Sequence, residues 1–378
     1  MANSGRRAEA LTLDGGRVRV LMVTPRYLPQ VGGVEIHVAE VAKRIASRGL
    51  DVTVLTTDVT GKLPACESRA GVVIRRVRAW PRNSDYYFAP QIWRAVKADD
   101  WSIVHCQGYH SLVAPLAMLA AAKAKLPYVV TFHSGGHSSR VRSSLRAAQQ
   151  LTLRPLLERA KRLIAVSQFE ADLFARRLRL PASKFVVIPN GAELPRITSS
   201  PATCKDLIVS VGRLERYKGH QKLLAALPLI LRERPEARVI LLGSGPYERA
   251  LRNLAISLGI DAHIDIRSVP AADRDGMATF VSSAALVVLL SSYEAHPIAV
   301  MEALALHRPV LVSLNSGLKE FVDRGLARGV PPNASTHDVA RAVLAQLERP
   351  LIPQAIELPT WDRCAEDVMR VYSAALGG

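Results

Sequence analysis

Short apolar runs alternate with amphipathic stretches along nearly the whole chain, and this alternation restricts the fold more than any other feature. Residues 18–24, VRVLMVT, form a near-continuous apolar run, typical of a strand in a parallel sheet that is covered on both faces. A helical pattern follows over 34–47, with apolar residues on one face. Further strands are expected at 52–57, 72–77, 103–106, 128–132, 163–166 and 185–188. Strand, helix and strand in succession predict an α/β fold with a doubly wound parallel sheet.

The alternation starts again after residues 194–205, LPRITSSPATCK, a segment rich in Pro, Ser and Thr that we interpret as a linker. Strands are expected beyond it at 207–211, 237–242, 263–266 and 284–290. With 378 residues and 49% hydrophobic side chains, the chain is long enough for two cores. We therefore expect a loose tail over 1–17, one domain over 18–195 and a second over 205–350.

The net charge of +17 lies almost entirely in the first half of the chain. Residues 1–200 contain 30 Lys and Arg against 14 Asp and Glu, whereas the remaining residues contain 20 against 19. This asymmetry predicts an anionic partner of the first domain: nucleic acid, an anionic membrane or a phosphorylated substrate. Arginine placed on solvated faces by a GC-rich genome explains the same charge equally well.

A basic stretch over 140–162 is the strongest local example of this charge, with seven Lys and Arg against one Glu. Leucines are interleaved with the bases, so an amphipathic helix lying on an anionic membrane surface is one interpretation. A domain helix with its polar face in water is the other, and Pro155 is expected to interrupt it.

Several classes of protein are disfavoured by simple patterns. The apolar run over 112–122 falls short of the roughly 18–20 residues that a bilayer-spanning helix needs. The first seventeen residues are polar and do not resemble a secretory signal. The four cysteines form no C-x-x-C pair, which disfavours a zinc site or a disulfide framework. A reducing, cytoplasmic location is therefore expected.

Residues 291–309, SSYEAHPIAVMEALALHRP, place two glutamates at the end of an expected strand and the start of a helix. Glu294 lies in the loop, Pro297 stands where a first helical residue is expected, and Glu302 lies eight positions after Glu294. In open α/β sheets ligands bind off the carboxyl ends of strands, where helix N-termini attract anions. A carboxylate there suits the hydroxyls beside a phosphate, which favours a sugar nucleotide. An acid that stabilises the helix dipole, with one solvated Glu, is the alternative.

Other loops at expected strand ends carry cations, glycines or a histidine. Arg213 and Lys218 lie in a glycine-bounded loop and can clamp a diphosphate. His133 follows a strand and would face a cleft, although such a His often only satisfies a neighbouring carbonyl. Gly32 and Gly33 precede a helix and allow close approach to a ligand, or form an ordinary tight turn. The acids of the D-x-D over 273–275 have the spacing of a metal site but are interpreted as a helix N-terminus.

Taken together, these segments resemble the GT-B glycosyltransferases of family 4, the retaining "glycosyl transferases group one". In the second domain the resemblance rests on VGRLERYKG, LLGSGP, YEAHPIAVMEAL and SGLKE. In the first domain it rests on the Gly32-Gly33 loop, TFHSGG, AVSQFEADLF and IPNGAE. The resemblance implies two Rossmann-like domains that face each other across a cleft, with the acceptor bound by the first and the donor nucleotide by the second. The final amphipathic helix, over 361–376, resembles the one that joins the first domain in this family.

The resemblance also implies a role for each site residue. Arg213 and Lys218 would bind the donor diphosphate, Glu294 the hydroxyls of the transferred sugar, and Glu302 those of the ribose. The implied catalytic residues are His133, Glu294, Arg213 and Lys218. The implied donor-binding residues are Gly32, Gly33, Arg213, Lys218, Glu294, His296, Pro297, Ile298, Ala299 and Glu302. Ala295-His296-Pro297 departs from the Gly-Phe-Gly frequent in the family, and His307 stands where Gly is usual, so donor specificity is less well determined than reaction class.

The predicted function is that of a retaining, metal-independent hexosyltransferase without a cofactor. It would move a hexosyl unit from a nucleotide-diphosphate sugar, with a UDP-sugar favoured, to a glycan, lipid-linked or small-molecule acceptor in polysaccharide or glycolipid biosynthesis. The expected location is cytoplasmic and peripheral on the inner face of the membrane, through residues 140–162. The alternatives are a sugar-nucleotide epimerase of the same architecture and a protein that binds an anionic polymer; since no nucleic-acid module is present, nucleic acid is not expected as a partner.

Overall fold

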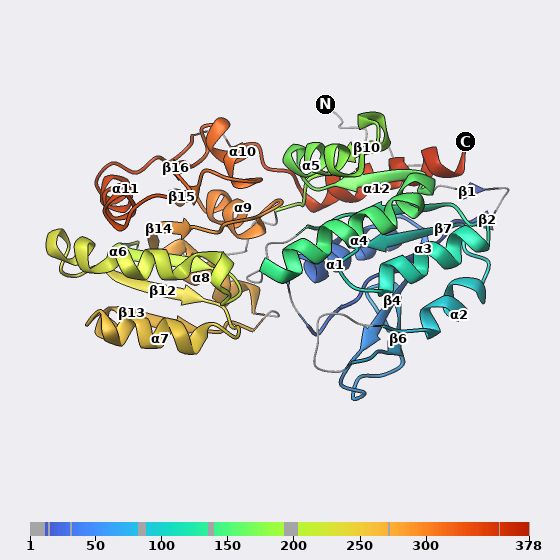
Figure 1. Cartoon of the computed structure of the whole chain (residues 1–378), viewed down its shortest axis with the longest axis horizontal. Coiled ribbons are helices and arrows are strands. Elements are labelled where there is room, and N and C mark those ends of the chain that lie inside the picture. Colours follow the sequence, from blue (N-terminus) through green and yellow to red (C-terminus); the bar gives the residue numbers. More distant parts are fainter. Residues whose placement is uncertain are drawn as a thin grey trace, which may run out of the picture. The chain divides into compact units, whose positions relative to one another are not determined.

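Two sheets, one of eight mainly parallel strands and one of six parallel strands, form the framework of the chain (Figure 1). The computed structural model describes residues 12–13, 16–30, 32–81, 88–134, 140–192, 203–270, 273–354 and 356–377. The chain divides into two units. Unit 1 comprises residues 1–133, 144–191 and 360–378, and unit 2 comprises 134–143 and 192–359. The α/β fold class expected from the strand and helix alternation is confirmed.

The sheet of unit 1 has the order β10-β9-β8-β7-β3-β4-β6-β5. Its strands are β3 (Arg19–Val23), β4 (Asp51–Asp58), β5 (Cys66–Arg69), β6 (Val72–Arg78), β7 (Ile103–Gln107), β8 (Tyr128–Thr131), β9 (Arg162–Ala165) and β10 (Phe185–Val187). The chain runs outward from β3 in one direction and returns to β7 on the other side of β3. The point where the strand order reverses therefore lies between β3 and β7, which is where open α/β sheets bind ligands.

Helices cover the sheet of unit 1 because almost every parallel connection needs a crossover. They are α1 (Gly33–Ser47), α2 (Gln91–Lys97), α3 (Val113–Lys123), α4 (Arg140–Arg159), α5 (Gln168–Leu178) and α12 (Trp361–Leu376). The core of this unit includes Leu21 and Val104, which pair across β3 and β7, and Met118 of α3, each at most 1% exposed. The three are buried together because both faces of the sheet are covered.

Helix α12 returns to unit 1 from the end of the chain and packs beside α1. Its apolar side, with Trp361, Val368 and Tyr372, is buried. Gly191 makes the approach possible, because a Cβ there would lie only 2.3 Å from the backbone nitrogen of Trp361. The predicted terminal helix is confirmed by these bounds.

The sheet of unit 2 has the order β13-β12-β11-β14-β15-β16. Its strands are β11 (Cys204–Val211), β12 (Arg238–Leu242), β13 (Ile264–Arg267), β14 (Ala284–Leu289), β15 (Val310–Ser313) and β16 (Arg328–Val330). Its helices are α6 (His220–Glu233), α7 (Glu248–Ser257), α8 (Arg274–Ser283), α9 (Ile298–Ala305), α10 (Leu318–Asp323) and α11 (Thr336–Glu348). The order reverses between β11 and β14, so the loops that follow these two strands are neighbours at the ligand-binding edge.

Three expectations from the sequence need correction, and one strand was missed. The tail over 1–17 is not entirely loose, because β1 (Thr12–Leu13) and β2 (Gly16–Arg17) pair antiparallel. Strand β5 was not predicted, and it pairs antiparallel with β6 because only the short turn over 70–71 separates them. Pro155 does not interrupt its helix, since α4 continues through it to Arg159. β11 begins at Cys204, inside the segment predicted as a linker, most of which lies outside the described residues.

Candidate active site

An ion pair between Lys218 and Glu294 joins the two loops at the reversal point of unit 2. Lys218 ends the 3-10 turn after β11, and its Nζ lies 2.5 Å from Oε1 of Glu294 in the loop after β14. Both side chains are mostly buried, with 16% and 12% exposed. Burial alone would lower the pKa of Lys218, but the Glu294 carboxylate outweighs it and the pKa of the ammonium is raised. The lysine therefore stays charged at neutral pH.

Close backbone packing holds the lysine loop in place. Gly219 has φ +78°, and a Cβ there would lie 2.0 Å from the carbonyl oxygen of Leu290 at the end of β14. Only glycine fits this position, since a side chain would meet both a strained backbone and a clash. Gly219 thus allows the loop after β11 to contact the loop after β14.

Glu294 is fixed by three further hydrogen bonds, and a fourth holds the residue Ser291 of the same loop. Its Oε1 accepts from the Ser291 hydroxyl at 2.8 Å, and its backbone nitrogen donates to the Ser316 hydroxyl at 2.9 Å. Its carbonyl accepts from the backbone nitrogen of Gly317 at 2.8 Å, and the Asn315 amide donates to the carbonyl of Ser291 at 3.1 Å. The SGLKE loop noted in the sequence therefore supports the glutamate loop from a third strand end.

Arg213 lies on the same loop as Lys218 but remains accessible. Its guanidinium is 2.7 Å from the Glu215 carboxylate, and its side chain is 51% exposed. The Glu215 side chain is only 14% exposed, whereas about half of the Arg213 side chain is exposed, so the guanidinium can be reached by an anionic ligand. The structure thus brings Arg213, Lys218 and Glu294, three of the four predicted catalytic residues, to one edge of unit 2.

Glu302 lies on α9, where its side chain is only 10% exposed and forms an ion pair with Arg274. Arg274 is the first residue of α8, and Asp273 caps that helix by accepting from the backbone nitrogen of Gly276 at 2.8 Å. The interpretation of the D-x-D as a helix N-terminus is confirmed. The arginine between the two acids was not predicted to contribute to the site.

The other predicted donor-binding residues of unit 2 surround the start of α9. Pro297 is the N-cap of this helix, and Ile298 and Ala299 are its first two residues, both half-buried. The ring of His296 lies 5.7 Å from that of Phe321, and burial lowers the pKa of His296 to about 4, so the ring is neutral. His307 has φ +53°, a left-handed conformation that favours glycine, which explains why glycine suits this position.

The remaining predicted residues lie in unit 1. Gly32 is the N-cap of α1 with an extended backbone, and Gly33 is the first helical residue. His133 follows β8 with φ +47°, and its side chain is buried at 8% exposure. Burial, reinforced by His37, His105 and His110, lowers the pKa of His133 well below its usual range. His133 is therefore a neutral ring in this structure.

Comparison with known proteins places the chain in a family. The family model for "Glycosyltransferase Family 4" matches residues 31–196, and the model for "Glycosyl transferases group 1" matches residues 197–357. The chain belongs to glycosyltransferase family 4. The resemblance noted from its motifs is thereby confirmed.

Two relatives of this family 4 enzyme and one solved structure of similar fold illustrate the match. It is 29% identical to the phosphatidyl-myo-inositol mannosyltransferase of Mycobacterium leprae over 94% of this chain and 96% of that protein. It is 28% identical to the GDP-mannose:cellobiosyl-diphosphopolyprenol alpha-mannosyltransferase of Xanthomonas oryzae over 81% of this chain and 80% of that protein. The Anabaena HepE structure in complex with UDP-glucose superposes with a TM-score of 0.70 at 18% identity, over 94% of this chain and 95% of that one. The fold is that of the GT-B glycosyltransferases.

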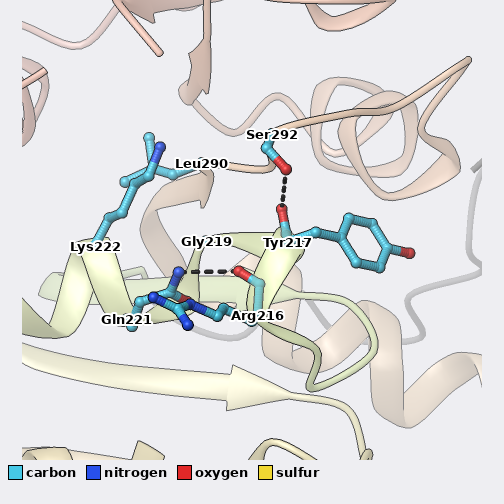
Figure 2. A pocket seen from close by; sticks show the side chains of 7 residues that line it. All are labelled: Arg216, Tyr217, Gly219, Gln221, Lys222, Leu290 and Ser292. Atoms are coloured by element: carbon cyan, nitrogen blue, oxygen red, sulfur yellow. Dashed lines mark hydrogen bonds between the residues drawn. The ribbon is translucent and has the colours of Figure 1, made fainter. Parts of the chain in front are cut away.

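A shallow pocket of about 230 Å³ lies beside the lysine loop of the family 4 enzyme, on unit 2 (Figure 2). Arg216, Tyr217, Gln221 and Lys222 line it together with Gly219, Leu290 and Ser292. None of the predicted site residues lines it. Lys218, which belongs to the same loop, is paired with Glu294 instead. This pocket and the predicted donor site are therefore different surfaces of the same loop.

Sequence reasoning missed the residues that hold the site residues of this family 4 enzyme in position. In unit 2 they are Arg274, Ser291, Asn315 and Ser316. The SGLKE motif, which begins at Ser316, was a signal for that residue, whereas nothing local marks Arg274 as the partner of a glutamate 28 positions away. In unit 1 a buried cluster of His37, His105 and Gln107 around His133 was also missed.

Two features often used to classify such proteins are not seen in the described part of the chain. None of the described helices is long and apolar enough to cross a membrane. No group of three or more His, Cys, Asp or Glu side chains that could hold a metal ion occurs among the described residues.

Proposed function

We propose that this family 4 enzyme is a retaining hexosyltransferase that takes a hexosyl unit from a nucleotide-diphosphate sugar. The observation that carries the proposal is the Lys218–Glu294 pair, which joins a cation and a carboxylate at the strand-order reversal of unit 2. In the structure each is the ion-pair partner of the other. A diphosphate would take over the lysine, and sugar hydroxyls would then donate to the glutamate.

The chemistry that follows uses only charges already held in place. Lys218 and the accessible Arg213 would neutralise the charge that develops on the departing diphosphate, which is the type of electrostatic stabilisation that lowers such barriers most. Glu294 would orient the sugar ring and Glu302 the ribose, with Gly32 and Gly33 approaching the phosphates and acceptor. The acceptor hydroxyl would attack on the face that the diphosphate leaves, and the diphosphate would accept its proton, so that the configuration is retained without a protein nucleophile or a metal.

We propose a UDP-sugar as donor, supported by the structural likeness to a protein that binds UDP-glucose. GDP-mannose is the second candidate, because a relative at 28% identity is named for that donor. The acceptor is proposed to be a hydroxyl of a glycan, lipid-linked or small-molecule acceptor. The lipid-linked class is supported by the two relatives whose names contain a phosphatidyl or diphosphopolyprenol group.

Contact with an anionic membrane is proposed through residues 140–162 on the cytoplasmic side. At the described end of this stretch Arg159, Lys161 and Arg162 are exposed, and Leu151 is 61% exposed. The side chains over 140–148 lie outside the described residues. Sedimentation with anionic liposomes would test the proposal: replacing Arg140, Arg142 and Arg146 with Glu should abolish it, and unchanged sedimentation would contradict it.

The donor is tested by calorimetric titration with UDP, GDP, UDP-glucose and GDP-mannose, followed by mass spectrometry of products formed with polyprenyl-diphosphate sugars and free hexoses. Tight binding of one nucleotide series and transfer to an acceptor with the anomeric configuration kept would support the proposal. Epimerised donor in the absence of any acceptor would instead identify an epimerase. Salt-sensitive DNA binding without nucleotide binding would identify the anionic-polymer alternative.

A further inference from the structure

A continuous network of buried polar side chains in unit 1 ends on His133. Gln107, the last residue of β7, has its Oε1 2.7 Å from Nε2 of His133. The amide nitrogen of the same side chain lies 3.2 Å from Nε2 of His105. Gln107 and His105 are fully buried, and His133 is nearly so. One amide therefore contacts a ring nitrogen of each histidine through atoms of opposite hydrogen-bonding character.

The amide decides which nitrogen of each ring carries the proton. A carbonyl oxygen can only accept, so Nε2 of His133 must donate to Gln107. An amide NH₂ can only donate, so Nε2 of His105 must accept. A neutral imidazole has one proton, which leaves Nδ1 as the acceptor nitrogen of His133 and makes Nδ1 the donor nitrogen of His105.

The far end of the network agrees with this assignment and reaches the last helix. Nδ1 of His105 lies 2.6 Å from the Tyr372 hydroxyl of α12, and Nε2 of His105 lies 2.7 Å from the Thr131 hydroxyl of β8. With the proton of His105 on Nδ1, the Tyr372 hydroxyl accepts from Nδ1 and the Thr131 hydroxyl donates to Nε2, whose one lone pair is shared between Thr131 and the Gln107 amide. Tyr372 and Thr131 are fully buried, so water does not compete for these bonds.

Contacts on other sides restrict movement of the His133 residue. Its backbone is in the left-handed region, and its carbonyl accepts from Nε2 of His110 at 3.3 Å. The His37 ring of α1 lies 4.4 Å from the His133 ring, edge to face, and Nδ1 of His37 donates to the Asn190 side chain at 2.9 Å. A strained residue held from three elements is typical of a functional position.

We infer that Gln107 is a positioning residue that holds His133 in its Nε2–H tautomer, so that Nδ1 accepts a hydrogen bond from a hydroxyl of the bound ligand. The inference rests on the proposed function, together with the position beside the transferred sugar that the family resemblance implies for His133. A ring held in this way is a neutral hydrogen-bond acceptor for a ligand hydroxyl. It does not contribute a positive charge or a general acid at that position.

The direct test is ¹⁵N NMR of the histidine-labelled full-length protein, with the His133 signals assigned by their loss in His133→Gln. The expected spectrum has a protonated nitrogen at Nε2 and a bare nitrogen at Nδ1 of His133, and the reverse assignment for His105. The opposite tautomer at His133 would overturn the inference. Thr131→Val is the matched control, since it removes a contact to His105 but none to His133 and should leave the His133 signals unchanged.

Gln107→Glu provides a second readout, which a merely structural role would not change. The carboxylate keeps the acceptor for Nε2 of His133 but replaces the amide donor to His105, and its charge should raise the pKa of His133 above its value in the wild type. The titratable groups that face His133 are His37 of α1, His105 of β7 and His110. All three are present in the wild type and in the variant, so the comparison isolates the change at position 107. Activity of the variant should then fall about tenfold between pH 8 and pH 6, while the wild type stays nearly flat, because the protonated ring has lost its acceptor.

The outcomes separate the inference from the proposed function. A flat pH profile for Gln107→Glu, with the variant folded, would overturn the role of Gln107. Full activity of His133→Gln would overturn the placement of His133 beside the substrate, and with it the ligand contact proposed here, even if the tautomer is as expected. Transfer activity of the wild type and its loss in Lys218→Ala test the proposed function independently of both.

Discussion

The two units share one architecture but arrange opposite chemistry at its reversal point. In unit 2 the loops after β11 and β14 bring charged groups together, Lys218 and Glu294, at 2.5 Å. In unit 1 the elements around β3, β7 and β8 bring together neutral groups, among them His37, His105 and His133, whose pKa values are all lowered by burial. The same fold therefore holds a charged pair in one unit and neutral hydrogen-bonding groups in the other.

We relate this difference to the two parts of the proposed donor, its diphosphate and its sugar. A departing diphosphate needs positive charge held in a fixed position, which a buried ion pair provides. A sugar hydroxyl needs an acceptor, and a neutral imidazole provides one without the desolvation cost of a buried charge. Substitutions at the charged pair and pH changes at the neutral cluster should therefore have different effects on activity and stability.

The largest expected effect concerns the charged site. Lys218→Ala should reduce kcat/KM at least about 1000-fold, roughly 4 kcal/mol, because the leaving group loses its buried cation. Steady-state kinetics would measure this, with Lys222→Ala as the matched control. Lys222 is a nearby lysine that bonds the Pro332 carbonyl instead of Glu294. Equal losses in the two variants would mean that general positive charge, and not the position of Lys218, supports the reaction.

The second prediction concerns the neutral cluster and its dependence on pH. Burial lowers the pKa of His37 to about 4 and that of His105 to about 3, against 6.5 in the unfolded chain. The unfolded state thus binds more protons below pH 6.5, and stability is lost as the pH falls through that value. Between pH 7.5 and 5.5 the free energy of unfolding of unit 1 should fall by about 3 kcal/mol from these two groups.

Tryptophan fluorescence measures this unfolding selectively, because all four tryptophans, at positions 80, 93, 101 and 361, belong to unit 1. Urea titrations at several pH values would give the slope. A free energy of unfolding that is constant over this range would show that these histidines take up protons in the native state at the same pH as in the unfolded chain, and the contrast between the units would disappear.

A third prediction tests the attachment of the last helix to unit 1. Gly191→Ala would place a Cβ about where the Trp361 backbone lies, 2.3 Å from its nitrogen. We expect a loss of about 2 kcal/mol in the free energy of unfolding of unit 1, again followed by tryptophan fluorescence. Gly33→Ala is the control, since nothing lies within 4 Å of its Cβ position and alanine suits a helix. If Gly191→Ala left the free energy of unfolding of unit 1 unchanged, α12 would have to dock elsewhere in solution.

The smallest expected effect concerns the second glutamate of unit 2. Arg274→Ala removes the ion-pair partner of the mostly buried Glu302 and should raise the KM for the donor about tenfold with little change in kcat, since the ribose does not react. Donor titration at saturating acceptor would measure it. A change confined to kcat would instead connect Arg274 with the reacting end of the donor.

Much of the fold followed from patterns within single segments. Continuous apolar runs such as 18–24 identified parallel strands, because a strand covered on both faces needs apolar side chains on both. The antiparallel β5 was missed, since CESR carries no such pattern. The helix through Pro155 was misjudged because one missing backbone donor is a local penalty that the rest of the helix can outweigh.

The residues of the site divide in the same way. The sequence by itself determined Arg213, Lys218, Glu294 and Glu302 as candidates, because they stand in or shortly after loops that follow expected strands of a parallel sheet, where ligands bind. Only the tertiary structure decided which groups meet. Gln107 and His133 are 26 positions apart, and His105 and Tyr372 are 267 apart. A hydrogen bond depends on the register of neighbouring strands and the docking of α12, which no local pattern encodes, so the partners and the proton positions they impose became visible only in the folded chain.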